Sequence, residues 1–120
     1  MMRKTVLFVL ATLGAATPAL ADQSASTDRT GYVAIAAGDL STAEQRIVAE
    51  RRIFPQRPEL MLNLASVYHR TGRESEARAL YAAVLDRPAV AMDLPSGAVA
   101  SSHDLASRAL ARQSQQIATR

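Results

Sequence analysis

The sequence of 120 residues contains no cysteine. Disulfide bonds and thiolate metal sites are therefore excluded, and so is a lipid anchor attached through a cysteine. A folded domain in this chain has to be stabilised by buried apolar surface alone.

Histidine is scarce, since His69 and His103 are the only two. Neither has a carboxylate or a second histidine at a spacing typical of metal ligands, so we expect no resident metal. Two histidines brought together by the fold could still hold an adventitious ion. Gly72 is followed by Arg-Glu-Ser and lacks the further glycine and the lysine of a phosphate-binding loop, so no nucleotide cofactor is expected.

The run Ser101-Ser102-His103-Asp104 contains the residue types of a hydrolytic triad. A triad requires a nucleophile, a base and an orienting acid that converge in space, and consecutive residues do not converge on one substrate atom. We interpret one serine as a helix cap and Asp104 as a favourable charge at the helix N-terminus. The sequence therefore predicts no enzyme, and a hydrolase is the least favoured of three hypotheses.

Long hydrophobic runs are absent except for one at the N-terminus, over 6–16. It follows the basic residues Arg3 and Lys4 and precedes the small-residue site Ala19-Leu20-Ala21. This three-part pattern is typical of a secretory signal peptide, which we place at 1–21.

The apolar run at 6–16 is roughly half of the ~20 residues that a membrane-spanning helix needs. Cleavage is therefore favoured, and the protein is expected in the periplasm or outside the cell. Anchoring in the inner membrane through an uncleaved signal is the alternative. The polar segment 22–27 is expected to be a flexible lead-in.

Strong charge of one sign is also missing. The net charge of +3 falls to about +1 once the two basic residues of the signal are removed. Three arginines cluster between 46 and 52, but Glu44 and Glu50 lie among them. This mixture is typical of a solvated helix face, so we expect no nucleic-acid partner.

What the chain does contain is an internal repeat. Gly38 and Gly72 are 34 residues apart, a period typical of a repeated pair of helices. Other pairs share the spacing: Gly31 with Ala65, Ala43 with Ala77, and Ile47 with Tyr81.

The first copy is predicted to contain a helix over 28–37, ended by Gly38. A second helix is predicted to begin at Ser41, because Ser41 and Glu44 have the spacing of a capping box. Pro55 cannot extend a helix and closes the segment.

The second copy is predicted to begin with a helix over 58–70, with Pro58 at its first position. Gly72 ends this helix as Gly38 ends the first. A further helix begins at about Glu74 and stops before Pro88, which completes a second hairpin.

The repeat is lost after the second copy. Pro95 and Gly97 oppose a continuous helix, so 89–101 is interpreted as a loop. A last helix is predicted over 102–116, with 117–120 as a tail. It could cap the open end of the array by laying four apolar residues against the preceding helix: Leu105, Ala106, Ala109 and Leu110.

Residues 31–88 resemble the tetratricopeptide repeat family, with repeats at about 28–57 and 58–88. The first copy departs from the family at Thr30 and Ala34. Its matching residues are Gly31, Gly38, Ala43, Ile47 and Pro55; those of the second are Leu60, Met61, Leu64, Ala65, Tyr68, Gly72, Ala77, Tyr81 and Pro88.

The resemblance implies an all-α fold, a short solenoid of two antiparallel helical hairpins plus a C-terminal capping helix. It also implies that the first helix of each pair lines a groove for a partner polypeptide. The groove positions correspond to Asp28, Tyr32, Glu59, Leu62, Asn63, Ser66, His69 and Arg70.

Asn63, His69 and Arg70 are the first candidates for ligand contact, and loop residues 93–97 are the second. Lysine and asparagine of the family's carboxylate-clamp subclass are replaced by Asp28 and Tyr32, so that version of binding is not supported. We expect an exported interaction module, an accessory in envelope assembly or secretion. The alternative is a structural envelope protein that forms homodimers through an exposed apolar edge.

Overall fold

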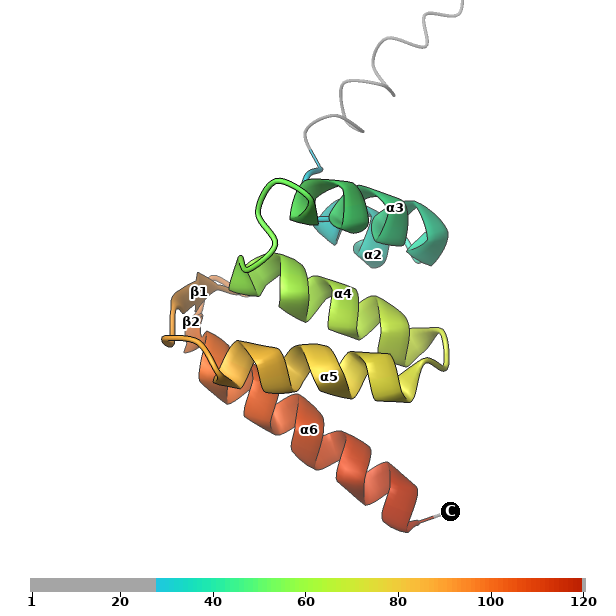
Figure 1. The fold of residues 1–120 in the computed structure, drawn as a ribbon, viewed down its shortest axis with the longest axis vertical. Helices are drawn as coiled ribbons and strands as arrows, with labels where there is room; N and C mark the ends of the chain where they lie inside the picture. Colours follow the sequence, from blue (N-terminus) through green and yellow to red (C-terminus); the bar gives the residue numbers. More distant parts are fainter. Residues whose placement is uncertain (1–27, 120) are drawn as a thin grey trace, which may run out of the picture.

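The computed structural model describes residues 28–119 (Figure 1). The predicted signal peptide and lead-in, and residue 120, lie outside the described residues. Five helices and a two-stranded sheet make up the described part. In chain order these are α2 (Tyr32–Ala36), α3 (Leu40–Arg51), α4 (Pro58–Arg70), α5 (Glu74–Leu85), β1 (Ala91–Asp93), β2 (Val99–Ser101) and α6 (Ser102–Ala118).

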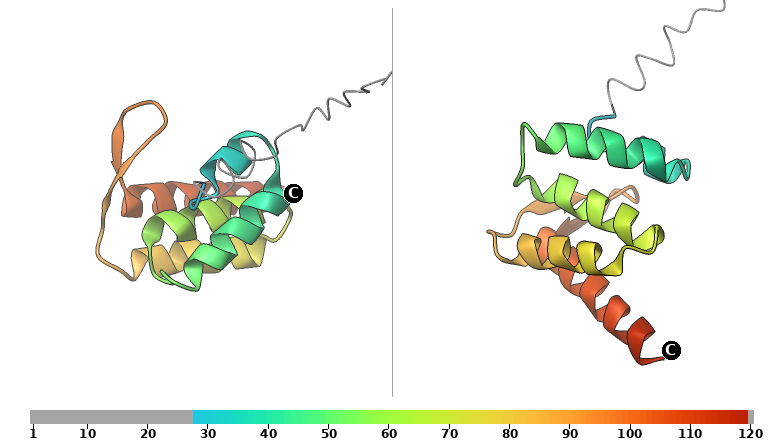
Figure 2. Two further views of the ribbon diagram at one scale, coloured as in Figure 1. Left: turned by 90° about the horizontal axis from the view of Figure 1, so that it is seen from above. Right: turned by 45° about the vertical axis from the view of Figure 1, so that its right-hand side comes forward.

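The helices stack in the order in which they occur along the chain (Figures 1 and 2). α2 and α3 form one antiparallel hairpin, α4 and α5 form the next, and α6 packs against α5. The predicted all-α solenoid of two hairpins with a capping helix is confirmed. No helix in the described range has the length and apolar character needed to cross a bilayer.

Residues at the helix ends determine the bounds of the second helical hairpin. Pro58 is at the start of α4, and Gly72 follows its end in the left-handed conformation, with a φ of 81°. Glu74 and Glu76 lie in the first turn of α5, where carboxylates favour the helix dipole. Both helices begin where the sequence predicts.

The first helix is shorter than predicted, because it begins at Tyr32 and not near Asp28. The Asp28 carboxylate accepts hydrogen bonds from the backbone N–H groups of Val33 and Ala34, at 3.1 and 3.0 Å. Asp28 thus caps a helix that starts four residues later. Gly31, with a φ of 71°, provides the bend between them.

The predicted capping box of the second helix is wrong. α3 begins at Leu40, and its cap is Asp39, whose carboxylate accepts a hydrogen bond from the Thr42 N–H at 3.2 Å. Ser41 is therefore inside the helix. The carboxylate of Glu44, the other half of the predicted box, binds Arg73 instead.

Two apolar clusters form the core and meet at Tyr68 and Leu80, which pack against both. The small residues at the helix crossings, Ala43, Ala65 and Ala77, have no exposed surface. The first cluster is Ala34, Ala43, Ile47, Leu60, Leu64 and Val67; the second is Met61, Leu62, Ala65, Ala77, Tyr81, Val84, Ala106 and Ala109.

The segment interpreted as a loop contains a β-hairpin. β1 and β2 pair antiparallel, with Met92 opposite Ala100. The turn between them closes through a hydrogen bond from the Gly97 N–H to the Leu94 carbonyl, at 2.9 Å. Pro95 stands at the second turn position and Gly97 has a φ of 85°, so the two residues that oppose a helix here favour a turn.

The start of α6 joins the hairpin to the helices. Ser101 caps the helix by accepting a hydrogen bond from the His103 N–H at 3.2 Å, as the sequence predicts for one of the two serines. Ser102 is fully buried, and its Oγ accepts a hydrogen bond from the Val90 N–H. His103 Nε2 donates to the carbonyl of Arg87, since a carbonyl oxygen can only accept. The side chains of Ser101, Ser102 and His103 therefore hold the start of α6 in place.

Candidate functional site

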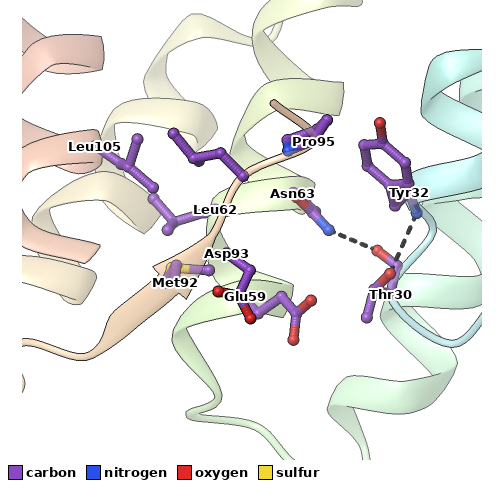
Figure 3. A pocket seen from close by; sticks show the side chains of 10 residues that line it. Thr30, Tyr32, Glu59, Leu62, Asn63, Met92, Asp93, Pro95 and Leu105 are labelled. Carbon is purple, nitrogen blue, oxygen red and sulfur yellow. Dashed lines mark hydrogen bonds between the residues drawn. The ribbon is translucent and has the colours of Figure 1, made fainter. Parts of the chain in front are cut away.

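Two of the pockets lie along α4: one is bounded on its other side mainly by the β-hairpin, and the other by α6. The pocket nearer the β-hairpin, the hairpin pocket, has a volume of about 390 Å³. Its lining residues come from the start of α2, from α4, from the β-hairpin and from α6 (Figure 3). They are Thr30, Tyr32, Glu59, Leu62, Asn63, Met92, Asp93, Leu94, Pro95 and Leu105.

The hairpin pocket combines an apolar side with two carboxylates. Leu62, Met92 and Leu105 supply the apolar side, and Glu59 and Asp93 lie next to one another in Figure 3. Both acidic residues are exposed. This end of the groove can hold an apolar side chain with a positive charge beside it.

The second pocket, which we call the basic pocket, has a volume of about 310 Å³. α4 and α6 form its walls, and Tyr81 of α5 contributes to it. Its lining residues are Ser66, His69, Arg70, Tyr81, Ala109, Arg112, Gln113 and Gln116.

A polar network underlies the basic pocket. The Glu74 carboxylate oxygen Oε2 lies 2.9 Å from His69 Nδ1 and 2.9 Å from Gln113 Nε2. Burial raises the pKa of Tyr81, and the positive charge of Arg112 partly offsets that effect. The phenol is therefore a neutral hydrogen-bonding group at physiological pH.

Seven of the eight predicted partner-binding residues line these two pockets. Asp28 is the exception: it is 6 % exposed, caps α2, and forms an ion pair with Arg46 at 2.9 Å. The hairpin pocket is lined by Tyr32, Glu59, Leu62 and Asn63, and the basic pocket is lined by Ser66, His69 and Arg70. Contact of these residues with a partner stays a prediction.

Two of the predicted groove residues also connect the helical hairpins to each other. Asn63 donates through its side-chain nitrogen to the Thr30 carbonyl at 2.9 Å, as Figure 3 shows. Arg70 donates from Nη1 to the Ile35 carbonyl at 3.2 Å. The groove is therefore held in shape by its own lining.

Sequence reasoning missed the contribution of α6. Arg112, Gln113 and Gln116 form one wall of the basic pocket, and none of them was predicted as a groove residue. Leu105, which was predicted to pack on the preceding helix, also lines the hairpin pocket. Asp93, Leu94 and Pro95 of the predicted second contact region line the hairpin pocket, and their contact with a ligand stays a prediction.

Stacked helical hairpins with two pockets along α4 define the class: a helical-repeat solenoid. Residues 34–90 match the model of the family described as Tetratricopeptide repeat. No significant match is found among curated proteins or among solved structures. The family match supports the resemblance seen in the sequence, and it indicates a protein–protein interaction module.

Proposed function

We propose that the groove along α4 binds a segment of a partner polypeptide. The observation that carries this proposal is the pair of pockets, which share α4 and differ in chemistry. Leu62 and His69 are seven residues apart on the helix, which corresponds to about 10 Å. An extended peptide covers that distance with about three residues, so one short segment can reach both pockets.

The pockets also suggest what such a segment contains. The hairpin pocket suits an apolar residue, and the carboxylates of Glu59 and Asp93 favour a cation near it. Arg70 and Arg112 favour a negative charge at the other end. A segment with separated charges would therefore complement the groove.

Export is part of the same proposal and rests on the sequence pattern at 1–21. An exported module of this kind fits an accessory role in envelope assembly or secretion. Fusion of 1–21 to a reporter enzyme that is active only outside the cytoplasm tests export, and a reporter that stays inactive would contradict it.

Ser66→Glu tests the groove directly, because Ser66 is half-buried on α4 and lines the basic pocket. Residues 22–120 would be used to select binders from a displayed library of random peptides of ~12 residues. We expect Ser66→Glu to weaken the binding of the selected peptides at least about tenfold, because its side chain fills the basic pocket and repels a negative charge there.

Ala82→Glu is the matched control, since Ala82 is exposed on α5 and lines neither pocket. It should leave peptide affinity unchanged, and both variants should keep the wild-type melting temperature. Selection of no groove-dependent peptide would contradict the proposal.

Self-association is the second candidate, and it is favoured by exposed apolar residues at the α2–α3 end. Val33 is 59 % exposed, Ile53 is 67 % exposed and Phe54 is 40 % exposed. Such residues can form an interface between copies. A dimer in light scattering, together with a failed peptide selection, would favour this candidate over the groove.

A further inference from the structure

The turn between α3 and α4 exposes two large apolar side chains at its tip. They are Ile53 and Phe54, and Ile53 is the most exposed of the large hydrophobic residues described. Every residue of the segment 52–57 is exposed. The turn projects beside the stacked helices at the end where α4 begins (Figure 1). It therefore offers a protruding tip and not a groove.

Backbone hydrogen bonds hold this tip in a fixed shape. The Phe54 N–H donates to the Glu50 carbonyl at 3.0 Å, and the Arg57 N–H donates to the Phe54 carbonyl at 3.4 Å. Pro55 occupies the second position of the turn from Phe54 to Arg57, which its fixed φ favours. Holding the tip at a surface therefore costs little conformational entropy.

Three arginines surround the apolar tip. Arg51 donates from Nη2 to the Pro55 carbonyl at 3.3 Å. Arg57 places its guanidinium over the Phe54 ring, 4.1 Å from the centre. The third, Arg52, is exposed next to the tip in the sequence. Positive charge and apolar surface are thus combined within one short turn.

This positive charge is not balanced within the turn. Neither Arg52 nor Arg57 forms an ion pair in the part of the chain that the structure describes. The segment 51–58 contains no acidic residue. Glu59 and Asp93 share a pocket of about 280 Å³ with Arg57, but both also line the hairpin pocket. These two carboxylates therefore lie on the groove side of Arg57.

Val90 extends the apolar surface beyond the turn. It is exposed between α5 and β1, and it lines the same pocket as Arg57. Apolar side chains next to unpaired arginines are typical of a surface that lies in the interface of an anionic bilayer. The methylene stem of arginine can then approach the acyl chains while its charge stays at the phosphates. A nucleic acid would pair with the arginines but would leave Ile53 and Phe54 in water.

We propose that the turn 51–57 docks the protein on the surface of an anionic phospholipid bilayer. Ile53 and Phe54 enter the interface between the head groups and the acyl chains, and Arg52 and Arg57 bind lipid phosphates. This contact is independent of peptide binding, because none of these four side chains lines the hairpin pocket or the basic pocket.

The chain contains no tryptophan, so one introduced tryptophan reports on its own surroundings. Phe54→Trp places this reporter in the tip. Val33→Trp is the matched control, because Val33 is an exposed apolar residue of α2, outside the turn. Both variants would be made in residues 22–120, without the predicted signal peptide, whose apolar run could itself bind lipid.

The probe is a vesicle of equal parts phosphatidylcholine and phosphatidylglycerol. We expect both variants to bind it, with the emission of Phe54→Trp shifted to shorter wavelength and that of Val33→Trp unchanged. Binding to vesicles of phosphatidylcholine alone should be at least about tenfold weaker, because the arginines then lack anionic partners.

Charge variants of the otherwise unchanged chain locate the contact. Arg52→Gln combined with Arg57→Gln should lower the affinity for the anionic vesicles at least about tenfold, measured by co-sedimentation. Arg78→Gln combined with Arg108→Gln is the matched control, since it removes the same charge from exposed positions on α5 and α6. It should lower the affinity less than about threefold, because these charges are screened from the lipid.

Equal binding to the neutral and the anionic vesicles would overturn the proposal, and so would equal losses in the two double variants. An unshifted emission of vesicle-bound Phe54→Trp would also overturn it. No vesicle binding, together with a lipid-free dimer that Ile53→Ser dissociates, would instead assign the tip to a second copy of the chain.

Discussion

Gly31 is a position where both the backbone conformation and the neighbouring helix require glycine. Its φ of 71° is in the left-handed region, and a Cβ built there would lie 2.6 Å from Ile47 Cγ1 and 3.2 Å from the Ala43 carbonyl oxygen. Glycine is therefore required twice, once by the backbone and once by the close approach of α3. Gly38, with a φ of 78°, has the backbone requirement alone, because nothing lies within 4 Å of its Cβ position.

We expect Gly31→Ala to lower the free energy of unfolding more than Gly38→Ala does. The positive φ costs about 1 to 2 kcal/mol in both variants. The contact with Ile47 should add about 1 to 3 kcal/mol for Gly31→Ala alone. Urea denaturation of both variants measures the difference, and equal losses would mean that Ile47 moves aside without cost.

The role of Asp28 could not be predicted at this scale. The sequence places it one 34-residue period before Leu62, on the groove face of a helix. In the structure its carboxylate reaches the N–H groups of Val33 and Ala34, five and six residues ahead. Such a cap depends on the left-handed bend at Gly31, and neither period nor propensity reveals that bend.

At the scale of elements, Arg73 links the two helical hairpins. From the turn before α5 it forms a two-pronged ion pair with Glu44 of α3, with N···O distances of 2.6 and 2.7 Å. Its guanidinium also lies over the Tyr68 ring, 4.3 Å from the centre. Arginine suits this place because its planar fork matches a carboxylate and stacks on an aromatic ring.

This pair gives the fold a defined dependence on pH. Hydrogen bonds from Arg73 hold the pKa of Glu44 below its ordinary value of 4.5. As the pH falls, the unfolded chain therefore takes up a proton at Glu44 before the folded chain does. The stabilisation from the pair is complete above the ordinary value and is lost as the pH falls through the lowered pKa.

Wild type should melt at a higher temperature than Glu44→Gln at neutral pH, and the gap should close as the pH falls below 4.5. Thermal unfolding followed by circular dichroism at several pH values measures the gap. Asp93→Asn is the control, because Asp93 is exposed and outside this pair. A gap that is constant with pH would show that the pair does not stabilise the fold.

The bounds of a helix were predictable where residues close by in the sequence determine them. Pro58 and Gly72 fix the bounds of α4 within the sequence. At the start of α3 two local caps are available, and Asp39 is the one used; Glu44, the partner expected for Ser41, binds Arg73 of the other helical hairpin. The β-hairpin was missed because strands of three residues carry too little periodicity to distinguish them from a loop.

At the scale of the whole molecule, α6 ends the array. Ala106 and Ala109 belong to the same buried cluster as Tyr81 and Val84 of α5. Without α6 this apolar stripe would face water, and two hairpins are fewer than the three repeats that a solenoid usually needs.

A chain truncated after Pro88 should therefore associate or aggregate, while the chain of residues 22–120 should not show this aggregation. Size-exclusion chromatography with light scattering compares the two at matched concentrations. A stable monomer of the truncated chain would argue against the capping role of α6.

Repeat proteins often unfold piecemeal, since each unit contacts only its neighbours. Here the two buried clusters meet at Tyr68 and Leu80, so neither hairpin completes its packing without the other. These two side chains, together with Leu60, Leu64 and Val67 of α4 in the first cluster, couple the unfolding of the two helical hairpins. Unfolding of the first helical hairpin alone would therefore expose apolar side chains of the second. A half-folded chain would lose these contacts and gain little conformational entropy in return.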